Sequence, residues 1–389
     1  MMEHQVRAAA EQQKDYMVKM RRFFHSNPEV SMQETHTTAA IAEELKKMGI
    51  PFRLTKPTGL VAEICGQTGG GTVALRADMD ALTIAEKTGL PFASQNEGIM
   101  HACGHDGHMA GLLGAARILN EMKSQFCGVV RLIFQPGEEV GMGAKTMMEQ
   151  GAMENADTVF GMHNMPQMPC GAIAGGAGPV FSAADHFKII IKGKAGHGAT
   201  PEVTVDATVA AAALVMNLQP LVSREVSSLD SLVVTVGQLH SGSRFNIISG
   251  EAVLEGTVRS FDPAIHDRIP GAMERVAKLT AQAYRAEAEV IYEKLVKPVV
   301  NEEKMTELCL NAAKKIVAEP SLVMQEGKQM IAEDFSEYMQ AAPGAFFLYG
   351  VGGEHPLHSD YYTAEEDALV TSSAMYAQVA LDTLAALKK

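Results

Sequence analysis

The sequence has no tryptophan, only five cysteines and fewer cationic than anionic residues. The cysteines are odd in number and widely spaced, which does not fit a disulfide framework and favours reduced thiols in a cytoplasmic protein. Lys and Arg total 33 against 46 Asp and Glu, so the net charge of −13 argues against a nucleic-acid-binding surface. We also expect no membrane span and no secretory signal, because the chain lacks the apolar runs that both require.

The 389 residues, 47% of them hydrophobic, suffice for one large domain or two smaller ones. Short apolar runs alternate with helical patterns, which predicts an α/β fold whose mixed, largely parallel sheet is flanked by helices. The expected strands are residues 60–65, 72–76, 129–134, 158–162 and 345–351. Helices are expected at 205–221, 302–317 and 331–341, among others.

The pattern changes near Phe181. From residue 186 to 295 the expected elements follow the order β-α-β-β-α-β, which is typical of ferredoxin-like domains. We therefore predict a discontinuous catalytic domain, residues 1–181 and 296–389, into which a lid domain of residues 182–295 is inserted.

The segment His101–His108 combines three imidazoles, a thiol and a carboxylate within eight residues. These are the ligand types that divalent transition metals prefer. A polar loop with a chance histidine cluster is the alternative, since short motifs produce false matches.

Further ligand-type residues come just after the expected strands. They are Asp80 after 72–76, Glu138 and Glu139 after 129–134, His163 after 158–162, and His358 after 345–351. In open α/β sheets the carboxyl ends of the strands form the ligand crevice. The pattern therefore favours a metal-dependent site at that edge over a chance histidine cluster.

Glu138 and Glu139 are adjacent, and an isolated pair of this kind is usually a solvated turn. In a metal crevice the two carboxylates would have different roles. One would coordinate metal, while the other would accept a proton from the attacking water.

The inserted domain offers further candidates. His197 lies between two glycines, which permit close approach by a ligand. We give a structural and a catalytic role about equal weight. Asn246 and Arg259 belong either to an ordinary polar sheet face or to a clamp for a substrate carboxylate, which Arg binds in a fork geometry.

The chain resembles the N-acyl-amino-acid amidohydrolases, which include hippurate hydrolases and indole-acetyl-amino-acid hydrolases, within the dinuclear-metal aminoacylase and carboxypeptidase superfamily. The motifs that carry this resemblance run in family order over nearly the whole chain: 21–29, 74–82, 100–108, 134–139, 161–163, 196–199, 246–248, 256–259, 333–335 and 356–359. Position 78 is Asp, where many relatives in the superfamily have a metal-binding His.

The resemblance implies two divalent metal ions, Zn or Mn, with Co and Ni as further candidates. The implied ligands are Cys103, His105, Glu139, His163 and His358. It also implies that Glu138 is the general base and later acid, and that His197 reaches the scissile carbonyl, often from the partner subunit of a homodimer formed through the lid. Asn246 and Arg259 would contact the substrate. Asp80 would orient a metal ligand by bonding to it, without binding the metal itself.

We therefore expect a cytoplasmic metal-dependent amidohydrolase that cleaves N-acyl or N-aroyl amino acids, such as hippurate, into a carboxylic acid and a free amino acid. An aminopeptidase or dipeptidase on the same scaffold is the alternative, although the sequence offers no clear binder for a free α-amine. A non-catalytic metal-binding protein is a further alternative, against which Glu138 argues.

Overall fold

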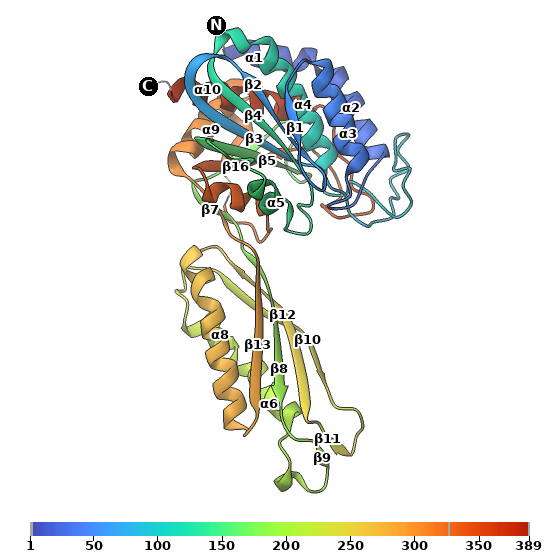
Figure 1. Cartoon of the computed structure of the whole chain (residues 1–389), viewed down its shortest axis with the longest axis vertical. Coiled ribbons are helices and arrows are strands. Elements are labelled where there is room, and N and C mark those ends of the chain that lie inside the picture. The colour runs from blue at the N-terminus through green and yellow to red at the C-terminus, as the bar shows by residue number, and fades with distance from the viewer. Residues whose placement is uncertain (1–2, 326, 388–389) are drawn as a thin grey trace. The chain divides into compact units, whose positions relative to one another are not determined.

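The computed structural model describes residues 3–325 and 327–387, and these form two compact units (Figure 1). Unit 1 comprises the described residues up to Val180, the segment from Val300 to Gly327, and the described residues from Asp334 onward. Unit 2 comprises Phe181–Val299 and Lys328–Glu333. The catalytic and lid roles assigned to these parts stay predictions.

Unit 1 is built on an eight-stranded sheet with the strand order β1-β2-β4-β3-β5-β16-β6-β15. The strands are β1 (Phe52–Leu54), β2 (Leu60–Cys65), β4 (Cys127–Gln135), β3 (Gln67–Asp78), β5 (Thr158–Met165), β16 (Gly344–Gly350), β6 (Ile173–Gly175) and β15 (Val323–Gln325). The central strands β4, β3, β5 and β16 run parallel, whereas β2 is antiparallel to β4 and β6 is antiparallel to β16. The predicted mixed, largely parallel sheet is confirmed.

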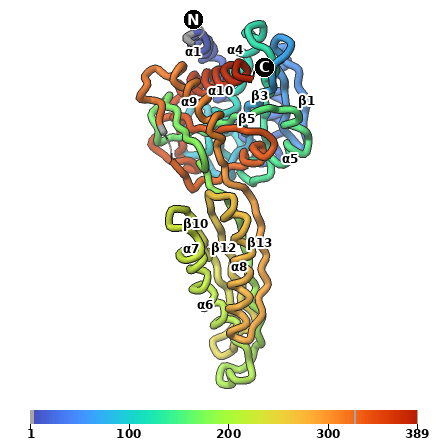
Figure 2. The backbone as a smooth tube through the Cα atoms, turned by 90° about the vertical axis from the view of Figure 1, so that its left-hand side faces the viewer, coloured from blue at the N-terminus to red at the C-terminus, as the bar shows by residue number. Residues whose placement is uncertain are grey.

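Helices cover both faces of this sheet. On one face α4 (His105–Glu121), α9 (Glu303–Ile316) and α10 (Ala368–Ala386) contact the strands, and α1 (Glu3–Gln12), α2 (Lys14–Ser26) and α3 (Thr35–Lys47) pack on or beside α4. Figure 2 shows α1 and α9 lying beside α10. The other face carries α5 (Gly143–Glu149) and the short 3₁₀ helix η4 (Asp334–Gln340). Successive side chains of a strand point to opposite faces, so Leu75 joins the main core while Arg76 faces η4.

Two of the expected helices were wrong in detail. Residues 331–341 contain the 3₁₀ helix η4 instead of an α-helix, because so short a segment does not distinguish a period of 3.0 from 3.6. The expected helix 205–221 is divided into α6 (Ala207–Asn217) and α7 (Gln219–Arg224). Pro220 lies in the first turn of α7, where its missing N–H is tolerated, and it cannot continue α6.

Unit 2 contains a four-stranded antiparallel sheet with the order β10-β12-β8-β13. Its strands are β8 (Ala184–Lys192), β10 (Leu232–Ser241), β12 (Glu251–Ser260) and β13 (Glu287–Val296), and α6 and α8 (Pro263–Ala283) pack on it (Figure 1). Along the chain the order is β8-α6-α7-β10-β12-α8-β13, and the first and last strands lie side by side. The ferredoxin-like insert is therefore confirmed. Two short strands, β9 (Gly196–His197) and β11 (Ile247–Ile248), pair with each other.

None of the helices in residues 3–325 and 327–387 combines the length and the apolarity that a membrane crossing needs.

Gly161 of β5 gives a test of the packing between the sheet and η4. A Cβ atom at this position would lie 2.7 Å from the Phe346 ring and 2.8 Å from the Phe335 ring. We expect Gly161→Ala to lower the free energy of unfolding of unit 1 by about 1–3 kcal/mol, measured by urea denaturation. Gly271 of α8 has open space around it, so Gly271→Ala should instead stabilise unit 2 by about 0.5–1 kcal/mol. An unchanged unfolding midpoint for Gly161→Ala would contradict the packing described here.

Candidate metal centre

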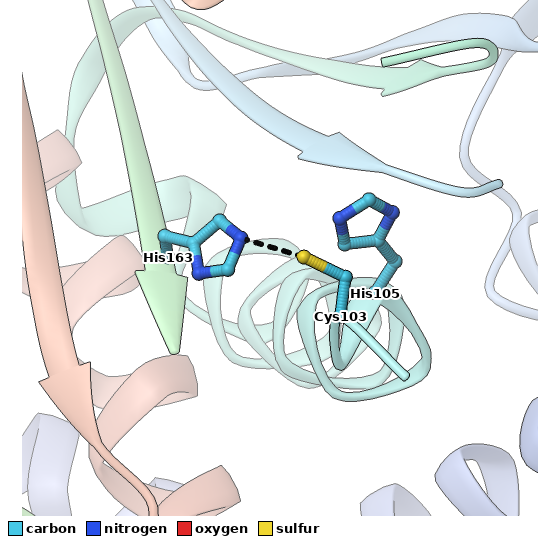
Figure 3. Close-up of side chains that lie close together, drawn as sticks. All are labelled: Cys103, His105 and His163. Atoms are coloured by element: carbon cyan, nitrogen blue, oxygen red, sulfur yellow. Dashed lines mark hydrogen bonds between the residues drawn. The ribbon is translucent and has the colours of Figure 1, made fainter. Parts of the chain in front are cut away.

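Unit 1 brings the five expected metal ligands together. Cys103 and His105 lie at the start of α4, His163 lies on β5, Glu139 follows β4 and His358 follows β16. The ligand atoms of Cys103, His105 and His163 lie within 4.8 Å of one another, and so do those of Cys103, Glu139 and His358. Cys103 belongs to both groups, and its Sγ lies 3.3 Å from His163 Nε2 (Figure 3).

Gly104 allows the residues on either side of it to reach this site. Its φ is +81°, in the left-handed region that favours glycine, and it is the N-cap of α4. A Cβ atom here would overlap the side chains of Asn164 and Tyr362. The sharp turn therefore lets Cys103 and His105 flank the start of the helix and point toward the same group of ligands.

Three buried atoms in the site have no hydrogen-bond partner: His105 Nε2, Glu139 Oε1 and Asp80 Oδ1. The first two lie 3.9 Å apart. The other ring nitrogen of His105 donates to the carbonyl oxygen of Asp80 at 2.9 Å, so Nε2 is the ring atom that remains for a cation. Since an unsatisfied buried polar atom is costly, the pair fits a site that a cation completes.

The electrostatics of the site also favour cations. Burial opposes charging of His105, but Asp78, Asp80 and Glu139 outweigh it and raise its pKa to about 10. Burial, together with the negative charges of Glu139 and Glu138, raises the pKa of the Cys103 thiol well above its usual value. Carboxylates contribute to both shifts, and they give this site a negative potential that a divalent cation would neutralise.

Asp80 connects two of the expected ligands. Its carbonyl oxygen accepts the bond from His105, and its Oδ2 accepts a 3.0 Å bond from the backbone N–H of Glu139. The hydroxyl of Ser31 donates to the same Oδ2 at 2.6 Å. Asp80 therefore bonds to both His105 and Glu139 and can orient both of them.

His108 belongs to the same motif but has a different environment. Its Nδ1 donates to Asp78 Oδ1 at 2.5 Å, and its Nε2 accepts a 3.0 Å bond from the backbone N–H of Asn164. Although Asp78, His105 and His108 are close enough to hold a metal, both ring nitrogens of His108 are already used. We therefore assign His108 to the support of the site.

Arg76 is a supporting residue that the sequence analysis missed. It is 1% exposed and donates to Asp78 at 2.7 Å, to Asp334 at 2.9 Å and to Gln135 at 2.7 Å. A carboxylate oxygen of Asp334 lies within 4.8 Å of one from Glu138. Arg76 thus links Asp78, which lies beside His105 and His108, to Asp334, which lies beside Glu138. The available signal was an arginine within an otherwise apolar strand.

The expected substrate residues all lie in unit 2, at two different places. His197 pairs with Ile247, and the carbonyl oxygen of Asn246 accepts a 2.9 Å bond from Gly198 N–H, so these residues share one end of the unit. Arg259 pairs with Val233. It lies eight residues after Glu251, the first residue of β12, and eight residues of strand span about 26 Å. Unit 2 therefore does not bring Asn246 and Arg259 together into one clamp.

A second buried cluster lies beside α4. Asp106 Oδ2 accepts bonds from Arg21 Nε at 2.8 Å and His25 Nδ1 at 2.9 Å, and His25 Nε2 lies 3.3 Å from Glu86. Burial opposes the charge on His25, but Asp106 and Glu86 prevail over it and over Arg21, and they raise the pKa of His25 to about 9.

The chain is similar to a known protein family, to named relatives and to a solved structure. The sequence pattern of Peptidase family M20/M25/M40 matches residues 74–382. An N-acetyl-L-cysteine deacetylase from Bacillus subtilis (strain 168) is 40% identical to the chain over 358 residues, which cover 92% of this chain and 85% of the relative. An IAA-amino acid hydrolase from Arabidopsis thaliana is 38% identical over 381 residues, which cover 95% and 85%. A solved dinuclear metal binding peptidase of the M20 family from Bacillus subtilis matches with a TM-score of 0.87 at 34% identity, covering 96% of this chain and 99% of that one.

The raised pKa of His25 predicts a pH-dependent stability. Because the folded pKa of about 9 exceeds the ordinary value of 6.5, the stabilisation is complete below pH 6.5 and is lost as the pH rises through about 9. We expect the urea midpoint of the wild type to fall over this range more steeply than that of His25→Gln, which has no proton to lose. Parallel midpoint curves for the two proteins would show that His25 is not charged in the folded state.

Proposed function

We infer the reaction from one premise: the chain belongs to Peptidase family M20/M25/M40. It is a metal-dependent amidohydrolase. We propose that its substrates are N-acyl or N-aroyl amino acids, of which hippurate is an example, and that it releases a carboxylic acid and a free amino acid. The deacetylase and the IAA-amino acid hydrolase, by their names, both act on amino acids that carry an N-acyl group, which supports this substrate class.

One observation carries the catalytic part of the proposal. The carboxylates of Glu138 and Glu139 and the ring of His105 place their ligand atoms within 4.8 Å of one another. Glu139 Oε1 and His105 Nε2 are both buried and lack a hydrogen-bond partner, which suits them to bind metal. Glu138 stands next to them and takes the role of general base.

We propose two divalent cations, Zn or Mn, with Cys103 as the ligand common to both. His105 and His163 would complete one set, and Glu139 and His358 the other. The sulfur ligand favours Zn, whereas carboxylate and imidazole ligands also suit Mn. When bound, the cations supply Lewis acidity for the amide carbonyl and the attacking water.

The residues of the chain perform the proton transfers and the positioning. Glu138 accepts a proton from the attacking water and donates it to the leaving amine. Asp80 holds Glu139 and His105 through the two hydrogen bonds described above. His197 stabilises the oxyanion that develops on the carbonyl.

In this proposal Asn246 and Arg259 contact the substrate at different points, because Asn246 precedes β11 and β12 whereas Arg259 is the next-to-last residue of β12. We also propose that the protein is a homodimer formed through unit 2 and located in the cytoplasm.

Removal of the base should separate catalysis from metal binding. We expect Glu138→Gln to retain both cations and to lose activity by about 10²–10⁴-fold, as is typical for loss of a general base. Activity on hippurate and metal content by elemental analysis are the two measurements. Glu149→Gln, an exposed position at the end of α5, is the matched control and should have wild-type activity. Unchanged turnover of Glu138→Gln would reject the assigned base.

Metal removal and substrate choice test the remaining parts. Dialysis against a chelator should abolish hydrolysis, and titration with Zn²⁺ or Mn²⁺ should restore it with an endpoint at two equivalents per chain. The restored enzyme should cleave N-acetyl and N-benzoyl amino acids faster than dipeptides with a free α-amine. A preference for the dipeptides would favour the aminopeptidase alternative, and full activity without metal would overturn the proposal.

A further inference from the structure

The turn that carries Glu138 and Glu139 is held by a buried carboxylate from another part of the chain. Glu34 is 0% exposed, and its Oε1 accepts hydrogen bonds from the backbone N–H groups of Gly137 at 2.9 Å and Met32 at 2.8 Å. The carbonyl oxygen of Gly137 in turn accepts a 3.0 Å bond from Gly143 N–H. Gly137 is thus fixed at both its N–H and its carbonyl, one residue before Glu138.

We propose that Glu34 is a positioning residue for the reaction: by holding the Gly137 amide, it sets the positions of Glu138 and Glu139 relative to His105. This inference rests on the proposed function, in which Glu138 is the base and Glu139 a metal ligand. It does not make Glu34 a catalytic residue, because Glu34 acts through the turn.

The loop that contains Glu34 contacts the same turn at a second point. Ser31 donates to Asp80 Oδ2, and that oxygen accepts the backbone N–H of Glu139. The N–H of Gly137, before Glu138, bonds to the Glu34 carboxylate, which also accepts the N–H of Met32. The N–H of Glu139, after Glu138, bonds to the Asp80 carboxylate, which also accepts the hydroxyl of Ser31. A shift of this loop would be passed directly to the position of Glu138.

The backbone here is held in an unfavourable conformation. Met32 has a φ of +64°, which is uncommon for a residue other than glycine, and its N–H is bonded to Glu34. Gly137 has a φ of +61°, and a Cβ atom on it would overlap the sulfur of Met32. The two segments are closely fitted, and Glu34 bonds to both. Conformations of this kind gather at functional sites, where the surrounding structure enforces them.

A role in stability alone does not account well for a carboxylate at this position. Burial raises the pKa of Glu34, which reflects the cost of placing its charge inside the protein. The hydroxyl of Thr58 donates to Oε2 at 2.5 Å, so three hydrogen-bond donors compensate the buried Glu34 carboxylate. Such bonds fix geometry more than they add net stability.

The test compares four variants of the full-length, metal-loaded protein. Glu34→Leu removes both bonds to Oε1, and Glu34→Asp keeps the charge but is too short to reach Gly137. Glu34→Gln can keep the geometry, because its amide oxygen can accept from Gly137 and Met32 while its NH₂ group donates to Thr58. Thr58→Val is the matched control, since it removes only the bond to Oε2.

We expect Glu34→Leu and Glu34→Asp to lower kcat by about 10–100-fold with KM changed by less than about 3-fold, since a misplacement of about 1 Å can cost this much. Their metal affinity, measured by competition with a chromogenic chelator, should also fall, because Glu139 moves with the turn. Glu34→Gln and Thr58→Val should keep kcat and metal affinity within about 3-fold of the wild type.

A residue that only stabilises the fold would give a different result. The inference is overturned if Glu34→Asp lowers the unfolding midpoint but keeps the kcat per metal-loaded site and the metal affinity of the wild type. It is also overturned if Glu34→Gln is as impaired as Glu34→Asp. If Glu34→Leu does not fold, Glu34→Asp and Glu34→Gln decide alone. If the wild type hydrolyses no N-acyl amino acid, the proposed function fails, whereas the chelator competition still tests whether Glu34 positions Glu139.

Discussion

Negative charge at the carboxyl edge of the parallel strands is the constraint around which unit 1 is organised. Asp78, Asp80, Glu138 and Glu139 meet where β3 and β4 end, in surroundings that burial makes costly for charge. Backbone N–H groups and Arg76 compensate part of this charge, and the unpaired atoms of His105 and Glu139 mark the part that is left for cations. The helix start at Gly104, the Asp80 contacts and the loop of residues 31–34 are all consequences of this arrangement.

Sequence patterns predicted the features that depend on local rules. Apolar strands such as 72–76 and 129–134 locate the sheet, and the carboxyl ends of parallel strands meet at one edge, so the sequence alone predicts that Asp80, Glu138 and His163 lie close together. The ferredoxin-like order of unit 2 follows from the same reasoning. The individual roles of Cys103 and His358 came from the resemblance alone, because spacing does not say which imidazole or thiol binds metal.

Features that depend on distant contacts could not be predicted. Arg76 meets Asp334 across 258 positions of sequence, and no local pattern reports such a pairing. His108 resembles a ligand in sequence, yet Asp78 and Asn164 occupy both of its nitrogens. Asn246 and Arg259 are close in sequence, but Asn246 lies beside β11 before β12 begins and Arg259 is the next-to-last residue of β12, so an extended strand carries them apart. The 3₁₀ form of η4 arises in a segment whose first residue, Asp334, accepts hydrogen bonds from Gln135 of β4 and from the backbone of Ala144 in α5.

The position of β16 within the sheet has a consequence for the order in which the chain can fold. Residues 344–350 form the strand that lies between β5 and β6, although both of its neighbours precede unit 2 in the chain. During synthesis, unit 2 can complete its own antiparallel sheet from a nearly continuous segment while unit 1 still lacks an interior strand. His163, on the strand that pairs with β16, therefore reaches its final surroundings only after unit 2 and the residues of β16 have been synthesised.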